Sequence, residues 1–355
     1  MLYLNHAGTS WPKPPSVAAA ADEALAASPD TWGQRFQHAH QAVAGHFGVE
    51  PEALLITPSC TQALAVAVAD VPWQPGDRAL TSGMEHHGLR RPLAKLRSVA
   101  VDVMPRSERG PLDLSALERA LADGGVRLVA MSVASNVTGE LLPYADIVAL
   151  AHAHGALCLL DGAQAAGWLE LDLDALQVDL FAFAGHKGPQ GPPGVGGLYV
   201  RPGVMLRSPP AACEGEVCRP GPGYCDTGSV SLPGLCGLAE GLAWMAQERP
   251  LPRVRQVEAS FRALAAALPG VSVVGGNGPR MPTCSLVVEG RRPVDLATAL
   301  AERGVVVRGG TQCAPAAHDT LGTGSQGTLR FSFGPGHTLH DAEVAAEALR
   351  RVVLG

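Results

Sequence analysis

The chain has 355 residues, of which 46% are apolar and 17% are charged, and its 27 Lys and Arg against 33 Asp and Glu give a net charge of -6. This composition excludes a disordered chain and a coiled coil, and the length suffices for two or three domains that bury large cores without disulfides. The negative balance, with no run of Lys or Arg, argues against a nucleic acid or an anionic membrane as the main ligand.

The cysteine content and the N-terminus bear on the compartment. Eight cysteines are too few for a disulfide framework, and residues 1–10 lack the basic region and apolar run of a secretion signal. No stretch reaches the roughly 18 apolar residues of a membrane span, because Asp161 and Gln164 interrupt the most apolar region. We therefore expect a soluble, cytoplasmic protein with reduced thiols.

From about residue 50 onward, apolar runs alternate with helical stretches, and Gly and Pro separate them. We expect strands at 53–57, 78–81, 99–104, 126–133, 156–160, 180–184 and 197–200, and helices at 61–70, 89–98, 114–122 and 145–154. Strand and helix in alternation predict a mostly parallel sheet covered on both faces.

A helix at 235–247 ends this pattern, and the later part of the chain has longer helices between strands. The helices are expected at 253–267, 294–303 and 341–352, and the strands at 271–274, 285–288, 305–308 and 328–333. We therefore predict a large domain at 14–247 and a smaller α+β domain formed by 1–13 and 248–355.

Two of the apolar runs end in polar side chains, at the edge where ligands of an open α/β sheet bind. Lys187 follows the run 180–184, and Asp161 closes the run 156–160, with Gln164 three residues on. Taken singly, these would be a solvated lysine and a helix N-cap. Together they suit pyridoxal 5'-phosphate, because a carboxylate keeps the pyridine nitrogen protonated while a partly desolvated lysine forms a Schiff base with the aldehyde.

At this point the sequence resembles the class V aminotransferase family of fold-type I pyridoxal-phosphate enzymes, in its cysteine desulfurase and selenocysteine lyase branch. The resemblance implies the α/β PLP-dependent transferase fold, with a large, mostly parallel seven-stranded sheet domain and a smaller α+β C-terminal domain. It covers nearly the whole chain through the segments Tyr3–Pro14, Thr57–Leu64, Glu85–His87, Ser135–Gly139, Asp161–Gln164, Gly185–Lys187, Thr227–Ser229, Arg308–Pro315 and Arg330–Ser332.

The resemblance implies a role for each residue around the cofactor ring. Lys187 would hold the aldehyde carbon and later move the proton of the substrate Cα. Asp161 would pair with the pyridinium, and Gln164 would donate to the phenolic oxygen. His86 would stack on the ring and act as an acid or base, although a His-His pair alone would more often be an exposed turn. Asn136 would face the ring edge.

The phosphate would be held at the start of a helix. Thr61 and the backbone amide of Cys60 open that helix, whose N-terminus carries free N–H groups and a partial positive charge. His186 would add a donor. Ser229 matches a position that reaches the phosphate of the neighbouring subunit, so the resemblance implies a homodimer.

The C-terminal half would contribute the substrate side of the site. Cys313 matches the nucleophile that takes sulfur from the substrate, and its Gly-rich polar loop suits presenting a thiol better than burying one. Arg308 and Arg330 would bind the substrate carboxylate, and Ala7 would also contact the substrate. Few residues separate Arg308 from Cys313, so the thiol cannot swing far, which resembles the branch whose persulfide is collected by a dedicated acceptor protein.

Four positions depart from the family pattern. Ala184 replaces a phosphate-binding serine, Ser229 replaces a threonine, His6 replaces an asparagine, and Tyr224 stands where an arginine is common. Losing one hydroxyl contact to the phosphate costs about 1 kcal/mol or somewhat more, so we expect weakened cofactor binding.

A metal site is the alternative for three cysteines that lie close together. Cys213, Cys218 and Cys225 contain no Cys-x2-Cys pair and have Pro and Gly among them, so we expect a loop with incidental thiols and no metal.

We therefore expect a PLP-dependent cysteine desulfurase that transfers sulfur from L-cysteine, or a related small amino acid, to Cys313 and releases L-alanine. One alternative is a PLP-dependent C–S or C–Se lyase, aminotransferase or epimerase in which Cys313 is dispensable. Another is a non-catalytic protein that kept the fold as a sulfur-relay partner.

Overall fold

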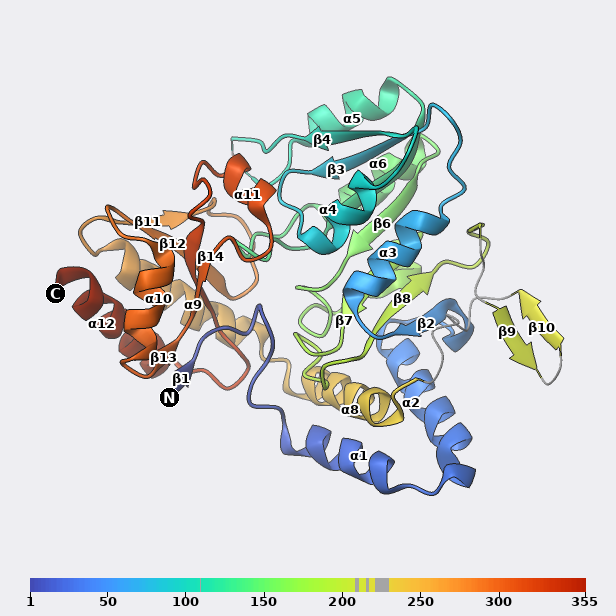
Figure 1. Cartoon of the computed structure of the whole chain (residues 1–355), viewed down its shortest axis with the longest axis horizontal. Coiled ribbons are helices and arrows are strands. Elements are labelled where there is room, and N and C mark those ends of the chain that lie inside the picture. The colour runs from blue at the N-terminus through green and yellow to red at the C-terminus, as the bar shows by residue number, and fades with distance from the viewer. Residues whose placement is uncertain (109, 208–210, 215–216, 221–229) are drawn as a thin grey trace.

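The computed structural model describes residues 1–108, 110–207, 211–214, 217–220 and 230–355, and the side chains of 208–229 lie outside the description (Figure 1). Its centre is a seven-stranded sheet with the order β2-β8-β7-β6-β5-β3-β4. Strand β8 is antiparallel to both of its neighbours, and all other pairs are parallel. The predicted α/β fold with a mostly parallel seven-stranded sheet is thus confirmed. The strands are β2 (Leu54–Thr57), β3 (Arg78–Ser82), β4 (Ala100–Met104), β5 (Val126–Ser132), β6 (Leu157–Asp161), β7 (Leu180–Ala184) and β8 (Gly196–Val200).

Both faces of this sheet are buried, as its continuous apolar runs predict. In β5, Val129 and Met131 belong to one core cluster and Leu128 and Ala130 to another, because successive side chains point to opposite faces. Helices α3 (Cys60–Asp70) and α4 (His87–Ala94) cover the second cluster. The first is covered by α2 (Trp32–His46), α5 (Leu114–Ala122), α6 (Tyr144–Ala153) and α8 (Leu232–Glu248), and α1 (Pro15–Ala26) packs on α8.

The C-terminal part forms its own antiparallel sheet with the order β11-β12-β15-β14, drawn in orange and red in Figure 1. A separate core cluster lies between this sheet and its helices, and Leu4 of the N-terminal segment belongs to that cluster. The N-terminal strand β1 (Leu2–Tyr3) pairs with β13 (Val305–Val306). The other elements here are α9 (Leu251–Ala266), β11 (Val271–Val274), β12 (Thr283–Val288), α10 (Pro293–Ala301), β14 (Arg308–Gly310), α11 (Pro315–Thr320), β15 (Thr328–Ser332) and α12 (Leu339–Leu354).

Several element bounds differ from the expectation. The strand expected at 305–308 is two strands, because β13 pairs with β1 and β14 pairs with β15. The helix expected at 89–98 begins at His87, since the His86 ring caps it, and it ends at Ala94. Helices α1 and α2 precede the first element that the sequence predicted. The remaining short elements are two 3-10 turns at Pro29–Thr31 and Pro51–Ala53, α7 (Leu173–Leu176), and the hairpin β9 (Ala211–Glu214) and β10 (Val217–Pro220).

None of the helices within the described part of the chain is long and apolar enough to cross a membrane. The domain division at residues 14 and 247 stays a prediction.

Candidate active site

Lys187 lies in a tight loop directly after β7. The loop is closed by the Gly185 amide, which donates to the Val195 carbonyl at 2.9 Å. A Cβ added at Gly188 would lie 2.2 Å from the carbonyl oxygen of Ala166, so only glycine fits behind the lysine. No hydrogen bond from the described residues reaches Lys187 Nζ. Burial lowers the pKa of Lys187, although Asp161 raises it, and an amine with a lowered pKa is a better nucleophile.

Asp161 ends β6 and is buried with one oxygen uncommitted. Its Oδ1 accepts hydrogen bonds from the Ala163 amide at 2.9 Å and from Cys60 Sγ at 3.4 Å. Within the described residues no donor reaches Oδ2. Burial raises the pKa of Asp161, while the Ala163 amide and Lys187 lower it. A cationic donor beside Oδ2 would satisfy this oxygen and restore the charged form.

The N-terminus of α3 offers backbone donors. Ser59 caps the helix by accepting from the Gln62 amide at 3.2 Å, which leaves the amides of Cys60 and Thr61 without partners among the described residues. The Cys60 side chain is buried and turned toward Asp161, so its contribution comes from its amide. Two free N–H groups at a helix N-terminus suit a phosphate.

His86 is held as a neutral ring. The Gly88 amide donates to His86 Nδ1 at 2.9 Å, so Nδ1 is the acceptor and Nε2 carries the hydrogen. Burial, followed by Lys187 and other nearby cationic groups, lowers the pKa of His86 to about 4. His86 therefore presents an N–H donor toward the site at neutral pH.

His186 directly precedes Lys187, and Lys13 is hydrogen-bonded to His186. His186 Nδ1 is 3.0 Å from Thr9 Oγ1, and burial lowers the pKa of His186 to about 4. Lys13 Nζ donates to the His186 carbonyl at 3.0 Å and to Ser10 Oγ at 2.6 Å. Burial lowers the pKa of Lys13 to about 8. The sequence pattern indicated no role for Lys13, because only the fold brings its half-buried ammonium to the peptide group that precedes Lys187.

Arg330 is buried without a carboxylate partner among the described side chains. Its guanidinium donates to the Asn136 carbonyl at 2.7 Å and to Asn5 Oδ1 at 2.9 Å, while Nε has no partner. Arg308 lies opposite it in the β14–β15 pair. Burial and Arg308 lower the pKa of Arg330 to about 10. Two cations paired across strands destabilise each other, so this position favours an anionic ligand.

Three predicted contact residues are bonded within the protein. Gln164 Nε2 donates to the Ala7 carbonyl at 2.9 Å, and the Ala7 amide donates to Ser332 Oγ at 2.9 Å. Asn136 Nδ2 donates to the Gln312 carbonyl at 2.8 Å. Their cofactor and substrate roles stay predictions.

Cys313 is exposed and lies near the lysine although it belongs to the C-terminal part. The His87 amide donates to the Cys313 carbonyl at 2.9 Å. The Cys313 thiol also raises the pKa of Lys187. The structure thus brings together residues from β6, β7, the start of α3 and the C-terminal thiol loop.

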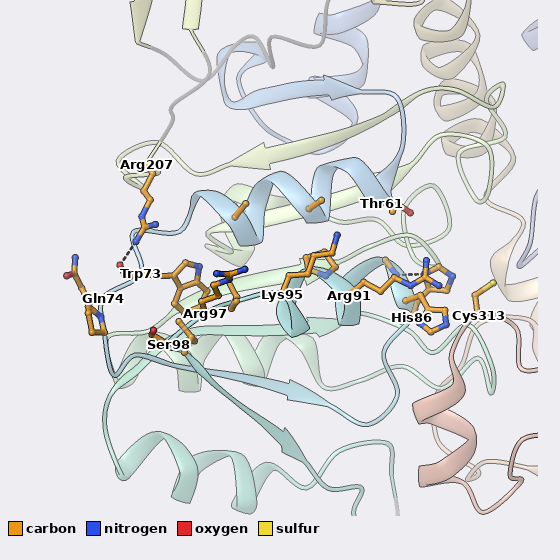
Figure 2. A pocket seen from close by; sticks show the side chains of 18 residues that line it. Thr61, Trp73, Gln74, His86, Arg91, Lys95, Arg97, Ser98, Arg207 and Cys313 are labelled. Carbon is orange, nitrogen blue, oxygen red and sulfur yellow. Dashed lines mark hydrogen bonds between the residues drawn. The ribbon is translucent and has the colours of Figure 1, made fainter.

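A groove of about 920 Å³ leads away from the thiol along α3 and α4. Thr61, His86 and Cys313 lie at one end, and Arg207 and Gln74 lie at the other (Figure 2). Arg91, Lys95 and Arg97 line it between these ends, and its lining includes no carboxylate among the described residues. Arg91, Lys95 and Arg97 are close together in the sequence, but only the fold brings Arg207 into the same groove, so the sequence alone did not indicate it.

Some predicted positions cannot be placed. Ser229, Tyr224 and Cys225 lie outside the described residues, as do the side chains of Cys213 and Cys218. Among the described residues there is no group of His, Cys, Asp or Glu that could hold a metal ion. Ala184 is buried at the end of β7 and has no hydroxyl to offer a phosphate.

Comparisons with known proteins agree with this geometry. The model of the aminotransferase class-V family matches residues 2–344. A probable cysteine desulfurase of Vibrio cholerae is 30% identical over 342 residues, which cover 90% of this chain and 83% of the relative. A probable cysteine desulfurase of Mycolicibacterium paratuberculosis is 31% identical over 299 residues, or 79% of this chain. The match spans only 43% of that longer relative.

A solved structure has the same fold as this chain. The apo structure of cysteine desulfurase from Thermococcus onnurineus NA1 superposes with a TM-score of 0.90 at 25% identity, over 100% of this chain and 95% of that one.

Proposed function

The chain belongs to the class-V aminotransferase family, and from this premise we propose that it is a pyridoxal-phosphate-dependent cysteine desulfurase. It would transfer sulfur from L-cysteine to Cys313 and release L-alanine. One observation carries the proposal: three groups lie close to one another. They are the amine of Lys187, which has no hydrogen-bond partner among the described residues, the buried carboxylate of Asp161 with one oxygen free, and the exposed thiol of Cys313 from a distant part of the chain.

The residues present fit pyridoxal 5'-phosphate. When bound, this cofactor supplies an aldehyde that takes an amine and a ring that accepts electrons from the substrate Cα. Lys187 Nζ would hold the aldehyde carbon, and Asp161 Oδ2 would pair with the ring nitrogen. The amides of Cys60 and Thr61 would hold the phosphate together with His186, while His86, Gln164 and Asn136 would border the ring.

The substrate would be oriented by its carboxylate. Arg330, with Arg308 beside it, offers guanidinium donors whose charge no acid of the described chain neutralises. Lys187 would then move the proton at the substrate Cα. His86 would donate through Nε2–H and would not take up a proton at neutral pH, because its pKa lies near 4.

Sulfur transfer would use the thiolate of Cys313. Its Sγ forms a bond to the substrate sulfur, and the Cβ–S bond breaks with its electron pair going to Cβ. Cβ then takes a proton, which completes the methyl group of alanine. The two sulfur atoms are oxidised to the persulfide level while Cβ is reduced, so no outside oxidant is required.

We also propose a homodimer and a sulfur acceptor protein. The homodimer rests on the family resemblance at Ser229, and light scattering of the purified protein tests it, with a monomer as the contrary result. The acceptor would approach along the groove beside Cys313, which supports the proposal because the thiol is open to a second molecule there. Reduced thiols suit a cytoplasmic location.

A substrate panel tests the proposed reaction. The holoenzyme is given cysteine, selenocysteine, cysteine sulfinate or cystine, and alanine and pyruvate are measured separately. We expect alanine from cysteine, and its loss with Cys313→Ala although the cofactor absorbance remains. Pyruvate as the main product, or sulfide release unchanged in Cys313→Ala, would instead indicate a lyase. A colourless protein that gains no visible absorbance with added cofactor would indicate a non-catalytic partner.

A further inference from the structure

The loop that carries the thiol has an uncommon backbone. Gln312 and Cys313 both have positive φ, at 45° and 59°. Residues other than glycine disfavour this left-handed region, and two in succession persist only where the surroundings hold them. The residues packed around this loop must therefore hold its backbone in place.

The Gln312 side chain is buried and fully bonded. Its Nε2 donates to the Thr328 carbonyl at 2.8 Å, and its Oε1 accepts from Thr328 Oγ1 at 3.2 Å. His318 Nε2 lies 3.0 Å from the same Oε1. Because the Thr328 carbonyl can only accept, the amide nitrogen must face it and Oε1 must face the histidine.

That orientation fixes the tautomer of His318, which is 0% exposed. Its Nε2 carries the hydrogen and donates to Gln312, while Nδ1 lies 2.7 Å from Thr323 Oγ1 and accepts from it. Burial lowers the pKa of His318, which keeps the ring neutral. In the hydrogen bond between the two side chains, His318 is therefore the donor and Gln312 the acceptor.

The backbone carbonyls of Gln312 and Cys313 accept hydrogen bonds from two residues of the candidate active site. Asn136 Nδ2 donates to the Gln312 carbonyl at 2.8 Å, and the His87 amide donates to the Cys313 carbonyl at 2.9 Å. The strained loop thus lies between the Gln312–His318 pair on one side and active-site residues on the other.

We propose that Gln312 and His318 form a buried brace that holds the backbone of Cys313 where its sulfur can meet the substrate sulfur, and that both are positioning residues. This rests on the proposed function. Without the brace the loop relaxes toward negative φ and the thiol moves away, while the lysine and the carboxylate stay in place. The brace also implies that an acceptor must come to the thiol.

The test compares His318→Phe and Gln312→Leu with matched controls at exposed positions, His340→Phe and Gln326→Leu, all as holoenzymes. We expect at least a tenfold lower rate of alanine formation in both brace variants, with KM for L-cysteine and the cofactor spectrum unchanged. Hydrogen exchange in segment 311–314 should be at least tenfold faster, while segment 283–288 is unaffected. The control variants should have the wild-type rate of alanine formation and the wild-type hydrogen exchange in segment 311–314.

The exchange measurement separates this proposal from the proposed reaction, since it needs no turnover. If the wild type forms no alanine but hydrogen exchange in segment 311–314 is still faster in the brace variants, only the proposed reaction is wrong. If exchange in 311–314 and alanine formation both stay within twofold of wild type, the brace is wrong. It is equally wrong if the cofactor absorbance falls together with alanine formation, because the damage then reaches beyond the loop. Should one variant fail to fold, the other decides.

Discussion

Replacing Glu85 by Gln should change how the stability of the protein depends on pH. Glu85 is 1% exposed beyond the end of β3, where its Oε1 accepts from Ser82 Oγ at 2.5 Å and its Oε2 accepts from the Ser132 amide at 2.9 Å. Burial raises the pKa of Glu85 from 4.5 to about 7, although the bonds from Ser132 and Ser82 lower it. Asp161 adds a smaller upward effect.

The sign follows from proton counting. Between pH 4.5 and about 7 the unfolded chain has released the Glu85 proton while the folded protein keeps it, so stability falls as the pH rises. Each pH unit in this interval is worth about 1.4 kcal/mol, which gives a total loss of about 3.5 kcal/mol, of which about 2.5 kcal/mol falls between pH 5 and pH 8. Gln has nearly the same shape and can bond to the same serines, but it has no proton to lose. The stability of the variant should therefore not fall in this way as the pH rises.

The assay is urea unfolding of both proteins at several pH values between 5 and 8. The free energy of unfolding of the variant minus that of the wild type should rise by about 2.5 kcal/mol from pH 5 to pH 8, whatever its value at pH 5. The exposed Glu289, replaced by Gln, serves as the control and should give a flat difference. A flat difference for Glu85→Gln as well would refute the reasoning, because the buried carboxyl would then ionise as freely as in the unfolded chain.

Four further substitutions have defined outcomes. Arg330→Lys should raise KM for L-cysteine and lower kcat/KM by roughly tenfold to a hundredfold, since a forked donor is lost; steady-state kinetics with an unchanged KM would count against carboxylate binding there. Gly139→Ala should destabilise the fold by about 1–3 kcal/mol in urea, because Gly139 has φ +75° and the new Cβ would lie 2.8 Å from two carbonyl oxygens. Gly194→Ala, with φ +85° and open space around it, should cost less, and equal costs would contradict the steric argument. Ser59→Ala should cost about 1 kcal/mol through loss of the α3 cap, and an unchanged unfolding midpoint would show that the cap is dispensable.

The main elements were predictable because their periodicity is local. The strand at 180–184 and the helix at 114–122 have the bounds that the sequence predicts. The split between β13 and β14 was not predictable from the sequence, because it depends on the pairing of β13 with β1 at the other end of the chain. Helix α4 begins early because an imidazole caps it, and capping by histidine is not among the usual start signals.

The site was predictable where a motif carries it. Lys187, Asp161 and Cys313 could be named because their segments resemble a known family, and the structure places them together. The bonds that hold them in place could not be named. Gln312 and His318 belong to no motif of their own, and their pairing depends on where Thr328 places its carbonyl. Glu85 stands within a recognised segment, but only burial reveals that its carboxyl differs from an ordinary one.

The most direct test of the account is the fate of the sulfur atom. The holoenzyme is incubated with L-cysteine in the absence of an acceptor, its thiols are then alkylated, and its peptides are analysed by mass spectrometry. The account predicts one additional sulfur atom on the peptide that contains Cys313, and none on those that contain the buried Cys60, Cys158 or Cys284. Formation of alanine while Cys313 carries no additional sulfur would contradict it.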